Sequence, residues 1–78
     1  MAYNVQLDVS HETTFELVNE FATGHGCTAT LILENGPAGG NPLYQFSSNK
    51  FSYLEELIGQ LLSYTPDEEA LKTMIWES

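Results

Sequence analysis

Strict alternation of apolar and polar side chains near the start of the chain limits the fold more than any other feature. Residues 3–9 read YNVQLDV, and every second side chain is apolar: Tyr3, Val5, Leu7 and Val9. This period of two is typical of a β-strand with one buried side. We therefore expect a sheet whose apolar side is covered by other elements, with Asn4, Gln6 and Asp8 on its opposite side.

A helix is expected to follow this strand. Over residues 10–24, apolar side chains recur at helical spacing, flanked by Leu17 and Phe21: Phe15, Val18 and Ala22. Ser10 or Thr13 can cap its start, and Thr13 forms a capping box with Glu16 three residues later. Gly24 is expected to end the helix, because glycine is favoured just past a helix C-terminus.

Two further strands are expected on either side of a loop. The stretch CTATLILE (27–34) alternates, and its inward set is predicted to be Cys27, Ala29, Leu31 and Leu33. The stretch LYQFSS (43–48) returns as the third strand. Between them, NGPAGGNP (35–42) contains three glycines and two prolines, which is typical of a loop and predicts a hairpin with a long connection.

Two helices complete the predicted order. The stretch FSYLEELIGQLLSY (51–64) has leucines at helical spacing, with Asn49 or Ser52 as caps. The last helix is expected to begin with Thr65 as cap, Pro66 at its first position and Glu68 closing a capping box. The resulting order, β-α-β-β-α-α, predicts one small α+β domain over residues 1–78 with a three-stranded, mainly antiparallel sheet.

The charge balance is the most informative part of the composition. Eleven acids face two bases, Lys50 and Lys72, which gives a formal net charge of −9. Direct binding to DNA or RNA is therefore not expected, because phosphate contacts need Lys and Arg. The chain shows no apolar run long enough for a membrane span and no signal peptide. Cys27 is the single cysteine, so no internal disulfide is expected and a cytoplasmic location fits.

The acids fall into three clusters that are candidate partner-binding residues. The first would stack along one face of the helix expected over residues 10–24: Glu12, Glu16 and Glu20. The second is the pair Glu55 and Glu56, and the third is the run Asp67, Glu68 and Glu69. Favourable interaction with a helix N-terminus is sufficient to explain the third cluster. The first has two interpretations: a face kept acidic for solubility, or a ladder with rungs about 6 Å apart that imitates nucleic-acid phosphates.

Catalytic and ligand-binding motifs are weak. His25 and Cys27 would share a face of a strand, as a base and a thiol nucleophile might, but no third group orients them. His11, Glu12, His25 and Cys27 lack the spacing of a metal site, and the NGPAGGN loop lacks the basic residue of a phosphate cradle. We expect no enzyme activity, no metal and no cofactor, and a contact with a partner protein as one role for that loop.

In size, charge and element order, the chain resembles the small acidic anti-CRISPR proteins that phages encode against host defences. The resemblance implies a cytoplasmic inhibitor that blocks the nucleic-acid-binding surface of a CRISPR effector by steric or electrostatic mimicry. No residue motif accompanies it. Other interpretations stay open: an antitoxin or immunity protein against a basic toxin, a thiol enzyme using His25 and Cys27, and a structural subunit or homodimer that assembles through the last helix and Trp76, whose amphipathic side chain suits interfaces.

Overall fold

The computed structural model describes residues 1–35 and 40–78 and contains seven elements in this part of the chain. In chain order they are β1 (Tyr3–Asp8), α1 (Phe15–Gly24), β2 (Thr28–Leu33), β3 (Leu43–Ser48), α2 (Phe51–Leu62), α3 (Glu68–Met74) and β4 (Trp76–Glu77). The expected α+β class is confirmed, and β3 has the bounds that the sequence predicts. The tip of the glycine-rich loop, residues 36–39, lies outside the described residues.

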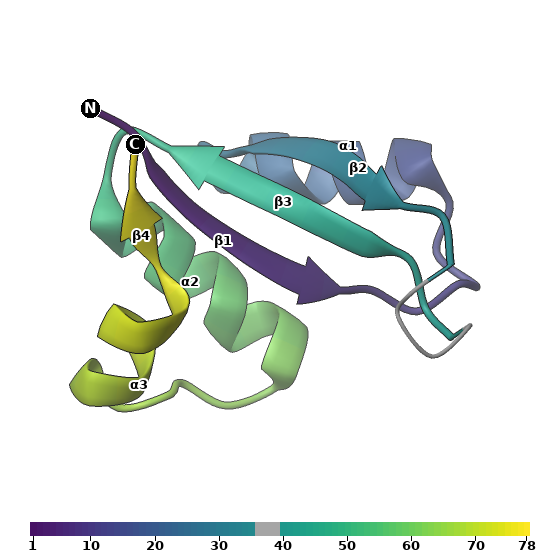
Figure 1. The fold of residues 1–78 in the computed structure, drawn as a ribbon. Helices are drawn as coiled ribbons and strands as arrows, with labels where there is room; N and C mark the ends of the chain where they lie inside the picture. The colour runs from purple at the N-terminus through teal and green to yellow at the C-terminus, as the bar shows by residue number, and fades with distance from the viewer. Residues whose placement is uncertain (36–39) are drawn as a thin grey trace.

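The strands form one antiparallel sheet in the order β2-β3-β1-β4 (Figure 1). β1 pairs with β3 along its whole length, from Tyr3 opposite Ser48 to Asp8 opposite Leu43. β2 lies on the outer side of β3, and β4 lies on the other side of β1, with Trp76 opposite Asn4. The sequence predicts three strands, so β4 is a correction. It was missed because two residues are too few to show a period.

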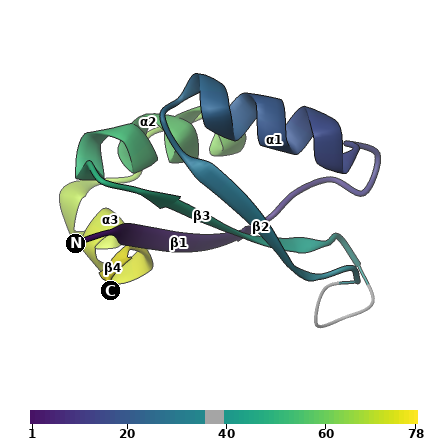
Figure 2. The ribbon, with the colours of Figure 1, turned by 90° about the horizontal axis from the view of Figure 1, so that it is seen from above.

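The helices cover one side of the sheet and leave the other open. Figure 2 shows α1 and α2 beside each other on the same side of the strands, and Figure 1 places α3 next to β4, near the edge of the sheet. Between the sheet and the helices lies a core whose largest fully buried members are Val5, Phe46, Leu54, Leu57, Ile58 and Leu71. The alternation of β1 is thus explained by helix packing on one side only.

The start of α1 corrects one prediction about the acids. Thr14, not Ser10 or Thr13, is the N-cap, and its hydroxyl oxygen accepts a hydrogen bond from the Leu17 amide at 3.3 Å. Thr13 instead lies in a preceding turn, where its amide donates to the carbonyl of Ser10. Glu12 therefore lies before the helix, and the expected three-rung ladder is reduced to a pair, Glu16 and Glu20.

The other helix ends also differ from expectation in detail. α2 begins after Lys50, which provides no side-chain cap, and it ends at Ser63, whose φ of 64° is left-handed. α3 begins two residues later than predicted, because Asp67 is its cap and accepts from the Ala70 amide at 2.9 Å. Thr65 is left free of that role, and its hydroxyl oxygen lies 3.2 Å from where a Cβ on Gly59 would be. Gly59 thus allows Thr65 to approach α2 closely.

β2 departs from the expected alternation at its end. Leu31 lies opposite Tyr44, but Leu33 lies opposite Leu43, so a β-bulge accommodates one extra residue around Ile32. Opposite residues in an antiparallel pair share a face, which places Leu33 on the open side with Leu43. The prediction that Leu33 points into the core is therefore wrong, whereas Leu31 lies on the covered side opposite Tyr44, as predicted. Leu31 and Leu33 both lie at the edge of the sheet and are 37% and 44% exposed. Cys27, just before β2, is buried as predicted.

Candidate protein-binding surface

The outer side of the helical layer carries the acidic pair of α1. Val18 and Ala22 bury one side of this helix, and Glu16 and Glu20 project from the opposite side, where both are exposed. Four residues separate them, so they lie about 6 Å apart along the helix axis. Neither lysine belongs to α1 or to the turn before it. This side of α1 therefore presents uncompensated negative charge.

The second acidic pair lies on the neighbouring helix and borders a groove. Glu56 is exposed on α2, and Glu55 is partly buried. Together with His25 at the end of α1 and Tyr64 beyond the end of α2, they line a groove of about 780 Å³. The imidazole Nδ1 of His25 lies 2.8 Å from the Phe21 carbonyl oxygen, so it carries the proton in that hydrogen bond. The groove thus combines carboxylates with an aromatic ring, a lining suited to a cationic side chain.

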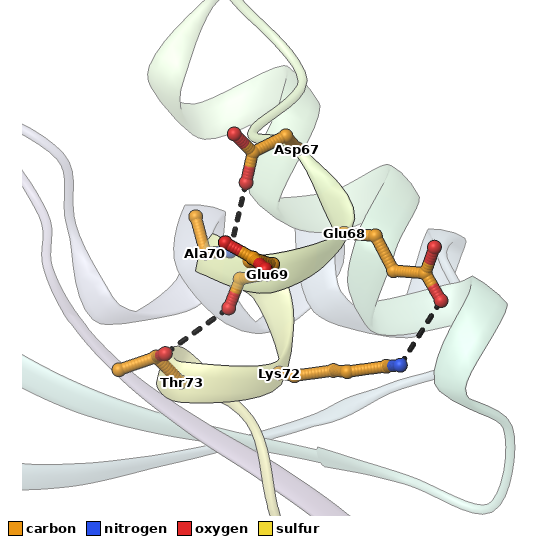
Figure 3. A network of polar contacts seen from close by, with 6 residues as sticks. All are labelled: Asp67, Glu68, Glu69, Ala70, Lys72 and Thr73. Carbon is orange, nitrogen blue, oxygen red and sulfur yellow. Dashed lines mark hydrogen bonds and ion pairs between the residues drawn. The ribbon is translucent and has the colours of Figure 1, made fainter.

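The third acidic cluster is largely engaged within its own helix (Figure 3). The carboxylate of Asp67 caps α3, and that of Glu68 forms an ion pair with Lys72 at 3.1 Å. Both members of that pair are well exposed, so it contributes at most a few tenths of a kcal/mol. Glu69, also exposed, adds charge to the first turn, where it interacts favourably with the helix dipole. The interpretation of this cluster as helix-terminus electrostatics is consistent with these contacts.

The two lysines lie away from the acidic pair of α1. Lys72 is paired with Glu68, and the ammonium of Lys50 lies 5.3 Å from the ring centre of Tyr53, a cation–π contact. Both positions belong to α3 or to the start of α2. The structure therefore brings Glu16, Glu20, Glu55 and Glu56 onto one helical layer, while Glu12 lies before α1 and the α3 cluster forms a separate group.

Trp76 does not belong to the acidic layer. It lies in β4 opposite Asn4 and is 42% exposed. Because opposite residues share a face, it is on the open side of the sheet, next to a polar network centred on Asn4. Asn4 Nδ2 donates to Ser78 Oγ at 3.0 Å, and its Oδ1 accepts from Ser47 Oγ at 2.6 Å. Trp76 and the glutamates are thus two separate candidate surfaces, not one.

The open side of the sheet is nearly free of charge. Gln45 Nε2 also donates to Asn4 Oδ1, and Gln6 Nε2 donates to Gln45 Oε1. Asp8, at the end of β1, contributes the one carboxylate of the strand positions on this side. Sequence reasoning expected Asn4 to be a solvent-facing residue, but it is 4% exposed because β4 and the C-terminal residues cover it. The residues around Asn4 in the sequence do not predict this burial, because the segment that covers Asn4 lies at the other end of the chain.

The thiol and the imidazole near the end of α1 do not form a nucleophile–base pair. Cys27 Sγ donates to the backbone carbonyl of His25 at 3.4 Å, while the ring of that histidine bonds to the Phe21 carbonyl. Burial raises the pKa of the Cys27 thiol, and a contact with Ser48 lowers it by less. The thiolate needed for nucleophilic chemistry is thereby disfavoured at neutral pH.

The histidines and the cysteine that were weighed as metal ligands are also separated. His11 Nδ1 lies 3.1 Å from Asn41 Oδ1 before the start of α1, whereas His25 and Cys27 follow its end. Within residues 1–35 and 40–78, no three metal-ligating side chains gather at one point. In the same part of the chain, none of the helices combines the length and the apolar character needed to cross a bilayer.

Comparison with known proteins gives no family assignment. No family model, no curated protein and no solved structure matches this chain.

Proposed function

We propose that this chain is a binding protein whose acidic helical layer occupies a positively charged surface of a partner protein. The observation that carries the proposal is the distribution of charge. Glu16, Glu20, Glu55 and Glu56 lie on α1 and α2, on one side of the sheet, whereas Lys72 pairs with Glu68 on α3 and Lys50 contacts the Tyr53 ring at the start of α2. A surface that gathers carboxylates in this way accelerates encounter with a basic partner and disfavours encounter with acidic ones.

The basic surface that fits best is one built for nucleic acid. Such surfaces present Lys and Arg at the spacing of phosphates and are large enough to receive a helix pair. The exposed pair on α1 repeats at about 6 Å, and the groove beside α2 can receive a basic side chain. The specific form we propose is an inhibitor of a DNA-binding defence complex, such as a CRISPR effector, that acts by blocking DNA.

The test measures loss of DNA binding by purified effector complexes when the chain is added. We expect a stoichiometric loss of DNA binding for at least one complex, with an association rate that falls at least tenfold between about 0.05 and 0.3 M salt because screening weakens steering. The double variant Glu16→Lys/Glu20→Lys is expected to bind that complex at least tenfold more weakly.

A matched control separates local recognition from net charge. The double variant Glu34→Lys/Glu77→Lys changes the charge by the same amount at two exposed positions outside the α1–α2 layer. It is expected to bind within about threefold of the unaltered chain, apart from weaker long-range steering. Equal weakening by both double variants would reject α1 as the contact surface. Inhibition of a toxin, with no effect on DNA binding, would favour an immunity protein instead.

A further inference from the structure

The outer edge of β2 has the composition of a strand edge that can pair with another strand. In the described parts of the chain no strand pairs with this edge, because β2 is the outermost strand of the sheet. Its sequence, TATLIL, has no charge, no proline and no glycine, and five of its six residues are exposed. Unpaired edges of this composition are templates for strand addition, and proteins usually protect them with charge or proline.

Apolar side chains gather beside this edge. Leu31, Ile32 and Leu33 are 37%, 41% and 44% exposed, which is unusual for three consecutive aliphatic residues. Phe15, 48% exposed, stacks on Tyr44 with ring centres 6.3 Å apart, and Tyr44 lies directly opposite Leu31. The start of α1 and the end of β2 therefore form one apolar rim.

Charge decides which occupant fits this rim. The chain carries a net charge of −9, but residues 21–33 contain no Asp, Glu, Lys or Arg. This segment therefore includes an exposed strand edge at which two copies can approach without bringing carboxylates together. A basic partner strand would find no carboxylate within β2, whereas a second copy presents the same neutral, β-branched sequence. We propose that β2 pairs antiparallel with β2 of a second copy of this chain.

The bulge fixes the register of this pairing. The strand is regular from Thr28 to Leu31 and irregular beyond. We place the two-fold axis at Thr30, which keeps Ala29, Thr30 and Leu31 of both copies within the regular part of the strand. Thr30 then lies opposite Thr30 of the second copy, and Ala29 lies opposite Leu31 of the second copy. The axis is perpendicular to the sheet, because opposite residues of an antiparallel pair must share a face. An alternative axis at Leu31 would require the pairing to cross the bulge.

The pairing has a consequence for the acidic layer. A two-fold axis perpendicular to the sheet keeps α1 and α2 of both copies on the same side of an eight-stranded sheet. The dimer therefore presents two acidic layers in one direction, which allows bivalent binding. Pairing through β2 does not depend on the proposed function. Bivalent binding does, because it requires the acidic layer to contact a partner.

The first experiment measures the mass of the full chain in solution. Sedimentation equilibrium is expected to show a monomer of 8.7 kDa in equilibrium with a species of twice that mass. Because the copies carry the same charge, raising the salt concentration should strengthen the dimer, whereas it should weaken a complex with a basic partner. A single monomeric species up to about 1 mM protein in 0.5 M salt, where repulsion is screened, would overturn the proposal.

Two lysine variants assign the dimer to an edge. Thr30→Lys places a charge on the exposed side of β2 and is expected to raise the dimer dissociation constant at least tenfold. Trp76→Lys makes the same charge change at the opposite edge of the sheet and should leave the dimer dissociation constant unchanged. The reverse result would overturn pairing through β2 and favour β4. Circular dichroism checks that each variant stays folded.

Disulfide trapping tests the register and does not rely on a destabilising variant. In a Cys27→Ala background, Thr30→Cys should form an intermolecular disulfide under mild oxidation, since opposite residues lie about 4.5–5.5 Å apart between Cα atoms. Leu31→Cys is the matched control and should cross-link far less, because each Leu31 lies opposite Ala29 of the second copy. Equal cross-linking of both variants, or of neither, would overturn the register centred on Thr30.

Discussion

The two sides of the sheet differ in what they bury and in what they expose. The covered side packs Val5 and Phe46 against helices whose outer surface carries Glu16 and Glu20. The open side has no helix above it and holds a row of amides and hydroxyls bonded to one another around Asn4. Stability is thus concentrated on one side of the strands, and the same side's helices carry most of the candidate recognition charge.

The difference shows how a small chain can tolerate its charge. The acids of α1 and α2 project away from the sheet, so the core beneath them contains no carboxylate. The open side could remain uncovered because its polar groups satisfy one another: within the described residues no buried side-chain nitrogen or oxygen lacks a partner. The rim at β2 has neither projecting acids nor polar groups bonded to one another, and its apolar side chains are exposed.

Two adjacent residues of β3 that point to opposite sides give the strongest test of the difference in stability between the two sides of the sheet. Phe46 is fully buried under the helices, and Gln45 lies on the open side. We expect Phe46→Ala to lower the free energy of unfolding by about 3–5 kcal/mol, enough to unfold most of a domain this small. Gln45→Ala should cost about 1 kcal/mol or less. Urea titrations would measure both, and similar losses would contradict the asymmetry.

The next largest effect is expected at Asn4, the one deeply buried polar residue of the open side. Asn4→Ala removes the acceptor for Ser47 and Gln45 and the donor to Ser78. We expect a loss of about 1–3 kcal/mol in the free energy of unfolding and faster amide exchange in β4. Gln6→Ala, in the same strand but exposed, is the control and should change either quantity little. A β4 that keeps its protection in Asn4→Ala would show that pairing with β1 alone holds this strand.

The sequence was sufficient for elements whose period continues over several residues. β3 was predicted with its observed bounds because LYQFSS resumes directly after the glycine- and proline-rich loop, and the structure shows burial alternating along all six of its residues. The helix α2 was predicted as well, since its leucines mark a long apolar face, although its N-cap is Lys50 and neither Asn49 nor Ser52. The α1 cap was less certain from sequence, because several hydroxyl residues compete for that role and the preceding turn selects Thr14.

The parts that sequence reasoning missed depend on contacts between distant residues. β4 exists because Trp76 lies opposite Asn4, and the two are 72 positions apart. The exposure of Leu33 follows from a bulge, which shifts the alternation within β2. The residue types of this strand do not predict the bulge. Among the candidate site residues, Glu12 was assigned to the helix because Ser10 was a candidate cap, four residues before the observed cap Thr14. The groove that joins His25 to Glu55 and Glu56 requires the packing of two helices, which a linear pattern does not show.

A smaller effect separates recognition from stability on the covered side. Glu16 and Glu20 are like charges four residues apart, an arrangement that destabilises a helix by a few tenths of a kcal/mol. Glu20→Lys replaces the repulsion with attraction, so we expect a gain of about 0.5 kcal/mol in the free energy of unfolding. The same change should weaken binding to a basic partner. A variant that is more stable and binds equally well would indicate that this charge serves solubility alone.

The smallest effect at neutral pH is expected at Cys27, which lies on the covered side where β2 begins. Burial raises the pKa of its thiol, so the unfolded chain loses this proton at a lower pH than the folded chain. The contribution to stability is therefore complete below the thiol pKa of the unfolded chain and is lost as the pH rises through the higher pKa of the folded chain. Thiol labelling should be slow at pH 7 and should accelerate on unfolding in urea. Fast labelling of the folded chain at pH 7 would contradict burial and would reopen a chemical role for the thiol, because a reactive cysteine must be both accessible and ionised.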